Sequence, residues 1–341
     1  MSRSHRASQH EPGTAVELNP LFSRPGESTI FPRFTLTDTN KQSEGFHHSL
    51  LEGKFLMCRL FGLHAGPRPV RATFWLLDAP DSLSVQSQRE PDGAGIGTFD
   101  TSGKAHVAKQ PLAAWEDHAF AREARDLKST TFLAHVRYAS TGALTMANTH
   151  PFEQDGRLFA HNGVLHGLDQ LDQRLGELGV MDLVLGQSDS ERLFALITAE
   201  TRLAGGDVRT GIVEAIKWVA RELPVFSLNF ILTTATDMWA LRYPATHELY
   251  LLERQASETV PLDARSHRIR SKSTELSRSP HVLFASEPMD SNPGWRPMAS
   301  GELVHVGPNL SVTSTVSFPK APSHLLTLAD LEPTAAASQQ P

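Results

Sequence analysis

The chain changes character at Cys58. Residues 1–56 are rich in Ser, Pro, His and charged residues and sustain no apolar period of 2 or 3.6. Such a stretch cannot bury enough apolar surface to fold by itself. We interpret 1–56 as a disordered extension, a removable leader or an over-long start assignment. The folded domain is expected over 57–318, and a flexible tail rich in Pro, Ala, Ser and Gln over 319–341.

From residue 58 onward, strand-like and helix-like segments alternate. Runs of strands interrupted by helix pairs indicate a layered α/β or α+β domain. A basic stretch at 265–272 is expected to be a solvated loop, because the chain as a whole is acidic. The expected strands are 58–64, 95–99, 105–109, 131–138, 158–161, 226–233, 238–243, 247–252, 282–285 and 303–306, and the expected helices are 70–77, 117–127, 188–204 and 208–223.

Composition excludes several classes of protein. With 341 residues, 40% of them hydrophobic, the chain can bury a large core. Its net charge of −6 argues against a nucleic-acid partner, whose binding surface is usually basic. No apolar run approaches the roughly 18 residues that span a bilayer, so no membrane partner is expected. One cysteine and no apolar signal core in the first 25 residues favour the cytoplasm.

Cys58 is the only cysteine, so an internal disulfide and a multi-cysteine metal site are both excluded. Met57 is the only methionine between Met1 and Met146. If translation starts at Met57 and the methionine is removed, Cys58 becomes the first residue. Its α-amine can then act as the general base for its own thiol. The alternative is a small hydrophobic residue buried in a core strand.

Two further motifs carry candidate binding residues. A strand ends at Arg137 and runs into Ser140, Thr141 and Gly142, which places a guanidinium at the mouth of a loop. Its planar fork of donors suits a carboxylate, although an arginine can also pair with a neighbouring acid. His150 precedes a proline, so its backbone is expected to be extended and its side chain fixed in direction; a packing role is the alternative.

The pair Asn162-Gly163 follows an apolar strand. It can form a tight hairpin turn, or it can supply an oxyanion hole from the Asn amide and the Gly backbone N–H. Asp189 lies at a predicted helix start, next to Ser188. It can cap that helix, or it can present a carboxylate to a substrate ammonium group.

Two other patterns indicate no cofactor. The glycine-rich run 92–97 matches the spacing of neither the Walker nor the Rossmann nucleotide-binding motif, and no predicted helix follows it. We therefore interpret it as a tight strand entry. His135, His150, His161 and His166 lack both zinc-motif spacing and accompanying acidic ligands. We therefore expect neither a cofactor nor a metal.

Taken in order, these motifs resemble the class II glutamine amidotransferases, which are N-terminal-nucleophile (Ntn) hydrolases. The resemblance covers most of residues 57–310 and is nearest to the stand-alone bacterial branch that includes a γ-glutamyl hydrolase of ergothioneine biosynthesis. It implies a four-layer αββα sandwich of the α+β class. It also implies roles for the residues of the motifs: Cys58 as nucleophile, Arg137 and Asp189 as ligands of the α-carboxylate and α-ammonium, Asn162 and Gly163 as the oxyanion hole, and Ser140 and His150 as lining of the glutamine loop.

The expected activity is cleavage of the side-chain amide of glutamine or a γ-glutamyl compound through a cysteinyl thioester. No ammonia-using domain is recognised in the sequence, so either a separate partner subunit accepts the ammonia or the protein is a plain hydrolase. With residues 1–56 attached, however, the nitrogen of Cys58 is an amide and cannot act as a base. A non-catalytic glutamine-binding or regulatory module is then the alternative.

Overall fold

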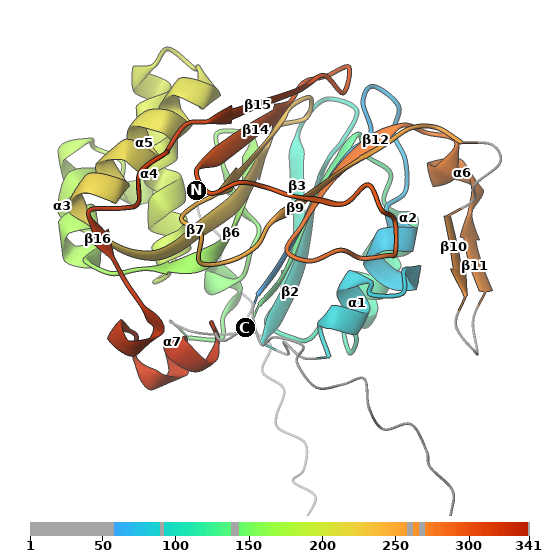
Figure 1. Ribbon diagram of the computed structural model, residues 1–341, viewed down its shortest axis with the longest axis horizontal. Coiled ribbons are helices and arrows are strands. Elements are labelled where there is room, and N and C mark those ends of the chain that lie inside the picture. The colour runs from blue at the N-terminus through green and yellow to red at the C-terminus, as the bar shows by residue number, and fades with distance from the viewer. Residues whose placement is uncertain (1–57, 89–91, 138–142, 258–261, 266–269, 340–341) are drawn as a thin grey trace, which may run out of the picture. The chain divides into compact units, whose positions relative to one another are not determined.

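The computed structural model describes residues 58–88, 92–137, 143–257, 262–265 and 270–339. All of these belong to the unit Leu51–Pro341; the segment 1–56, expected to be an extension, lies outside the described residues. Two antiparallel sheets dominate this unit (Figure 1).

The first sheet begins with β1, the strand that follows Cys58. Its strands are all antiparallel to their neighbours, and β1 lies between β12 and β4. In spatial order the sheet consists of β13 (Arg296–Pro297), β9 (Tyr250–Arg254), β12 (His281–Ala285), β1 (Arg59–His64), β4 (Thr131–Arg137), β2 (Gly93–Phe99) and β3 (Ala105–Gln110).

The second sheet carries the candidate oxyanion residues on β6, which pairs with β5 and β7. A short strand, β16 (His324–Leu325), adds to β7 in parallel. In spatial order the rest of the sheet consists of β15 (Val312–Val316), β14 (Glu302–Val306), β8 (Met238–Arg242), β7 (Pro224–Thr233), β6 (Arg157–Leu165) and β5 (Phe152–Gln154).

Helices cover the outer face of each sheet (Figure 1). The second sheet packs against α3 (Leu168–Glu177), α4 (Asp189–Leu203) and α5 (Val208–Glu222). The first sheet packs against α1 (Leu83–Gln86), α2 (His118–Asp126) and the π-helical turn η1 (Phe74–Asp78). The remaining elements are the hairpin β10 (Leu262–Arg265) and β11 (Arg270–Ser273), α6 (Thr274–Ser277), α7 (Pro333–Ala337), and the 3₁₀ turns η2 (Met146–Asn148), η3 (Met181–Leu183) and η4 (Leu328–Asp330).

Successive side chains of β1 and β6 point to opposite faces of their sheets, and this alternation divides the core into layers. Phe61 and Phe159 pack under the helices, whereas Leu60 and Leu158 belong to the cluster between the sheets. The result is helices, sheet, sheet and helices, which confirms the expected αββα sandwich. Among the described helices, none has both the length and the hydropathy needed to cross a bilayer.

The helix starts follow the sequence signals. Asp117 caps α2 by accepting the Ala119 N–H at 2.8 Å. Ser188 caps α4 by accepting the Glu191 N–H at 3.2 Å, so Asp189 is the first residue of that helix. Side-chain capping of this kind satisfies backbone donors that have no partner within the helix.

Three stretches differ from their predicted structure. The basic stretch at 265–272 contributes the ends of β10 and β11, while 266–269 lies outside the described residues. The helix expected over 70–77 is reduced to the turn η1, followed by the separate helix α1. In the stretch expected to be a flexible tail, β16, η4 and α7 form, because apolar side chains there find a partner surface that composition cannot reveal.

Candidate active site

Cys58 lies one residue before β1 and is 8% exposed. Leu60, two residues later, faces the space between the sheets, and the period of two directs Cys58 to the same side. The Cys58 carbonyl oxygen accepts a hydrogen bond from Asn162 Nδ2 at 2.7 Å. The candidate nucleophile and the candidate oxyanion residue are therefore in direct contact, although 104 positions separate them in sequence.

Arg137 is the last residue of β4 and is buried. Because Arg59 pairs with Val136 in antiparallel register, Cys58 and Arg137 are the next residues in line on adjacent strands. Arg137 Nη1 donates to the Ala143 carbonyl at 3.4 Å. Ser140, the loop residue expected beside it, lies outside the described residues.

The glycines of the run 92–97 have a packing role. Gly93, Gly95 and Gly97 alternate along β2, and a Cβ on each would contact the segment 149–158. A Cβ on Gly95 would overlap the His150 carbonyl oxygen. Only glycine allows this close approach of two backbones. The strand entry inferred from sequence is thus a whole strand, and its bare face positions the His150 loop.

His150 is buried, with its ring 4.2 Å from that of His135 and 4.6 Å from that of Phe152, measured between centroids. Burial lowers the pKa of both histidines, that of His135 to about 3, and the Arg137 charge adds to the effect. Both rings are therefore neutral at pH 7. The two rings therefore add no charge beside Arg137, which is here called the candidate carboxylate clamp.

Lys109 fixes the same loop from β3. Its ammonium donates to the carbonyls of Thr149 and Pro151 at 2.7 and 3.2 Å and lies 5.0 Å from the centre of the Phe152 ring. Desolvation lowers its pKa to about 8, although Glu191 opposes this shift. Sequence reasoning missed this residue, and an isolated lysine gives no signal by which to find it.

Asn162 and Gly163 lie inside β6, so they form no hairpin turn. In register, Asn162 pairs with Asn229 of β7. A Cβ on Gly163 would overlap the Ser227 carbonyl of that strand, so glycine is required here by the contact between strands. The Asn162 amide has two N–H groups, and only one can be used by the Cys58 carbonyl.

Asp189 sits at the start of α4 and is buried. Its Oδ2 accepts the Leu165 N–H at 3.0 Å, at the end of β6, and its Oδ1 accepts the Ser190 N–H at 2.8 Å. The Ser190 hydroxyl lies 2.9 Å from His161 Nδ1. Burial lowers the pKa of His161, and the Asp189 charge opposes that shift. The carboxylate is thus held by backbone donors at the end of the strand that carries Asn162.

The geometry therefore brings Cys58, Asn162 and Arg137 to one end of the space between the sheets, with Asp189 at the end of β6. Within the described part of the chain, no group of three or more His, Cys, Asp and Glu residues is arranged to hold a metal ion. A buried cysteine, amide donors, a cation and an anion can together bind an amino acid and attack its side chain.

The family model for class II glutamine amidotransferases matches residues 57–324, and the chain belongs to this family. The chain is 26% identical to the γ-glutamyl-hercynylcysteine sulfoxide hydrolase of Mycolicibacterium smegmatis, over 73% of this chain and 96% of the relative. It is also 26% identical to a putative glutamine amidotransferase of Haemophilus influenzae, over 78% and 89% of the two chains.

The same fold occurs in the glutamine phosphoribosylpyrophosphate amidotransferase from B. subtilis. The TM-score is 0.54 at 20% identity, with 77% of this chain and 50% of that chain covered. The chain thus spans about half the length of that larger enzyme. At this identity the likeness establishes the fold alone.

Proposed function

We propose that the protein hydrolyses the side-chain amide of glutamine or of a γ-glutamyl compound. The observation that carries the proposal is the 2.7 Å contact between Asn162 Nδ2 and the Cys58 carbonyl, with Arg137 next in register. The second N–H of the Asn162 amide remains for a developing oxyanion beside the Cys58 thiol. The name of the M. smegmatis relative, a hydrolase of a γ-glutamyl compound, supports the same substrate class.

In the proposed reaction, the Cys58 thiol gives its proton to the α-amine of the same residue, and the sulfur attacks the amide carbon. Asn162 and Gly163 stabilise the tetrahedral oxyanion. The C–N bond breaks as the α-amine passes the proton to the departing amine, which leaves a γ-glutamyl thioester. Water then adds to the thioester, and the thiol leaves as the free γ-carboxylate forms.

Binding of the substrate uses the remaining charged residues. Arg137 takes the α-carboxylate in two parallel hydrogen bonds, and Asp189 takes the α-ammonium group. His150 and Ser140 are proposed to line the glutamyl pocket. The released ammonia either passes to a partner subunit or is set free. The γ-glutamyl end is bound in the same way in both cases.

The base exists only if Cys58 is the first residue of the mature chain. The deciding experiment is intact-mass measurement of the purified protein, followed by a glutaminase assay on the same sample. We expect a mature N-terminus at Cys58 and release of ammonia from glutamine. A stable full-length chain that binds glutamine without turnover would instead support the non-catalytic binding module.

A further inference from the structure

The segment 328–339, here called the C-terminal segment, lies beyond the stretch matched by the family model. It contains η4 and α7. Leu331 and Ala335 are buried and pack against Val164 of β6 and Phe226 of β7. At its end, the Gln339 side chain is 1% exposed. The segment therefore covers a defined surface at the ends of β6 and β7 (Figure 1).

That surface lies on the same face of β6 as Asn162. Ala160, Asn162 and Val164 alternate along β6 and so share one face, about 7 Å apart from one to the next. Ala160 belongs to the core between the sheets, and Val164 belongs to the cluster under the C-terminal segment. The candidate oxyanion residue thus lies between the inter-sheet core and this segment.

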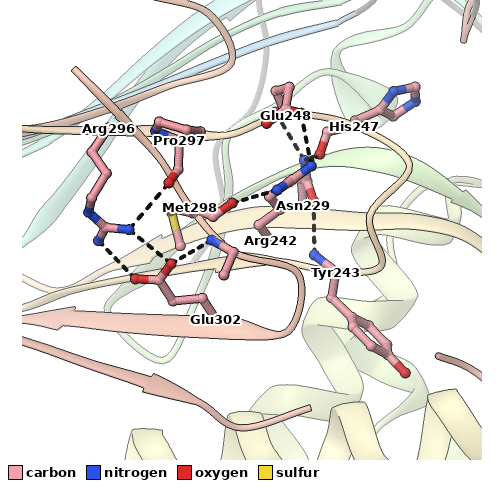
Figure 2. Close-up of polar contacts among 10 residues, drawn as sticks. Asn229, Arg242, Tyr243, His247, Glu248, Arg296, Pro297, Met298 and Glu302 are labelled. Carbon is pink, nitrogen blue, oxygen red and sulfur yellow. Dashed lines mark hydrogen bonds and ion pairs between the residues drawn. The ribbon is translucent and has the colours of Figure 1, made fainter. Parts of the chain in front are cut away.

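A second contact ties the segment to the loop between β8 and β9. Gln339 Oε1 and His247 Nε2 are 2.8 Å apart. The His247 carbonyl accepts a hydrogen bond from Asn229 Nδ2 at 3.2 Å, and Asn229 is the register partner of Asn162 (Figure 2). Arg242 Nε donates to the same carbonyl at 2.8 Å. Gln339 therefore rests on a loop whose backbone is fixed beside the site.

The two neighbours of β1 define two sides of Cys58. Arg137 lies on the β4 side. On the β12 side, Leu60 N donates to Ser286 Oγ at 2.9 Å, and Arg59 pairs with Glu287 at 3.0 Å. His247 lies just before β9, whose Tyr250 pairs with Ala285 of β12, so His247 lies on this same side of β1.

We propose that the C-terminal segment, together with His247, forms the wall that faces the leaving amine. The inference rests on the proposed function: a γ-glutamyl group held by Arg137 extends its scissile amide to Cys58 and its leaving group beyond, away from the clamp. The wall then admits ammonia or a small amine and limits bulky amines. It sets which γ-glutamyl amides the site accepts.

The test uses the protein in its mature form and three variants. One ends after Thr327 and removes η4 and α7 while keeping β16. Gln339→Ala removes the contact with His247 and the hydrogen bond that Gln339 Nε2 donates to Ser338 Oγ. Thr334→Ala, on the exposed face of α7, is the matched control. Turnover of glutamine is compared with that of γ-glutamyl-p-nitroanilide, and labelling of Cys58 is timed with iodoacetamide and with fluorescein maleimide.

We expect truncation to raise the ratio of anilide to glutamine kcat/KM, and the ratio of maleimide to iodoacetamide labelling rates, by about tenfold or more, since pocket contacts discriminate on this scale. Gln339→Ala moves both ratios in the same direction by a smaller factor, and Thr334→Ala leaves them unchanged. Ratios within twofold of the parent in both Gln339→Ala and the truncated chain overturn the wall. If the truncated chain does not fold, unchanged ratios in Gln339→Ala alone overturn it.

The labelling ratio keeps the two proposals separate. Cys58 is the only cysteine of the sequence, so each label reports on that thiol without any turnover. A parent protein that hydrolyses no γ-glutamyl amide contradicts the proposed function. If the parent hydrolyses glutamine but neither ratio changes when the segment is altered, only the proposed wall is contradicted.

Discussion

The two sides of Cys58 are built differently. On the β4 side, Arg137 and the His150 loop are held by strand register and by the bare glycine face of β2, all within the matched family stretch. On the β12 side, His247 is held by side-chain amides and by Gln339, which lies beyond that stretch. The shared fold therefore supplies the proposed glutamyl clamp, whereas a segment outside the matched stretch contacts the opposite side.

The two sides also differ in how tightly backbone geometry constrains them. At Gly95 a single added carbon would overlap a main-chain carbonyl, so the clamp side cannot relax without moving two segments. The other side relies on side-chain hydrogen bonds, which a substitution can remove while the strands stay in place. We therefore expect changes on the clamp side to abolish function or stability, and changes on the other side to tune them.

The largest expected effect concerns the residue between the two sides. Cys58→Ala removes the nucleophile and should lower glutamine kcat by at least about 10⁴-fold, as the loss of a catalytic nucleophile does in other hydrolases. Glutamine binding, measured by calorimetry, should persist, because Arg137 and Asp189 remain. Residual turnover within tenfold of the parent would contradict the assignment of Cys58.

Arg137→Ala should break the clamp. Without the guanidinium, the α-carboxylate loses two charge-assisted hydrogen bonds, and kcat/KM for glutamine should fall by about 10²–10³-fold, mostly through KM. Arg137→Lys keeps the charge without the fork and should recover only part of the loss. Arg125→Ala on the exposed surface of α2 is the control. Unchanged turnover in Arg137→Ala would rule out the clamp.

Gly95→Ala tests the backbone contact behind the clamp. The new methyl group overlaps the His150 carbonyl oxygen, so β2 or the loop must shift, and we expect a loss of about 3 kcal/mol in the free energy of unfolding. Gly176→Ala in α3 is the matched control, since a Cβ there meets nothing within 4 Å and the helix should gain slightly. Urea titrations of both variants measure the difference, and equal stabilities would refute the contact.

Much of the fold was predictable from local pattern. Strands such as β1 and β2 and helices such as α4 and α5 are visible because apolar periods of 2 and 3.6 are sustained and polar caps mark the helix starts. The layering into αββα came from the family resemblance and not from periodicity. The order of strands depends on contacts between distant segments, such as β1 with β12, which no local pattern encodes.

The candidate site was predictable only in part. Asn162-Gly163 carries a turn signal, and only the pairing of β6 with β7 shows that it continues a strand. Asn229, Lys109 and Gln339 could not be found, because each acts through a partner far away in sequence. The C-terminal segment has the composition of a tail, and its few buried apolar residues are informative only beside Val164 and Phe226.

The smallest expected effect concerns His247, on the β12 side. Burial, followed by the charges of Arg59 and Arg242, lowers its pKa to about 4, although the contact with Gln339 opposes the shift. Because this value lies below the roughly 6.5 of an unfolded histidine, its contribution to stability is complete above about pH 6.5 and is lost as the pH falls towards 4.

Between pH 7 and 5 this single group should therefore cost about 2 kcal/mol in the free energy of unfolding. His247→Gln does not titrate and can still donate to Gln339, so its stability should fall by about 2 kcal/mol less than that of the parent over the same range. Paired urea titrations at the two pH values measure this difference. His135→Gln supplies the comparison on the clamp side, because the pKa of His135 is also lowered, to about 3. Parallel pH profiles for His247→Gln and the parent would show that His247 is not buried beneath the C-terminal segment.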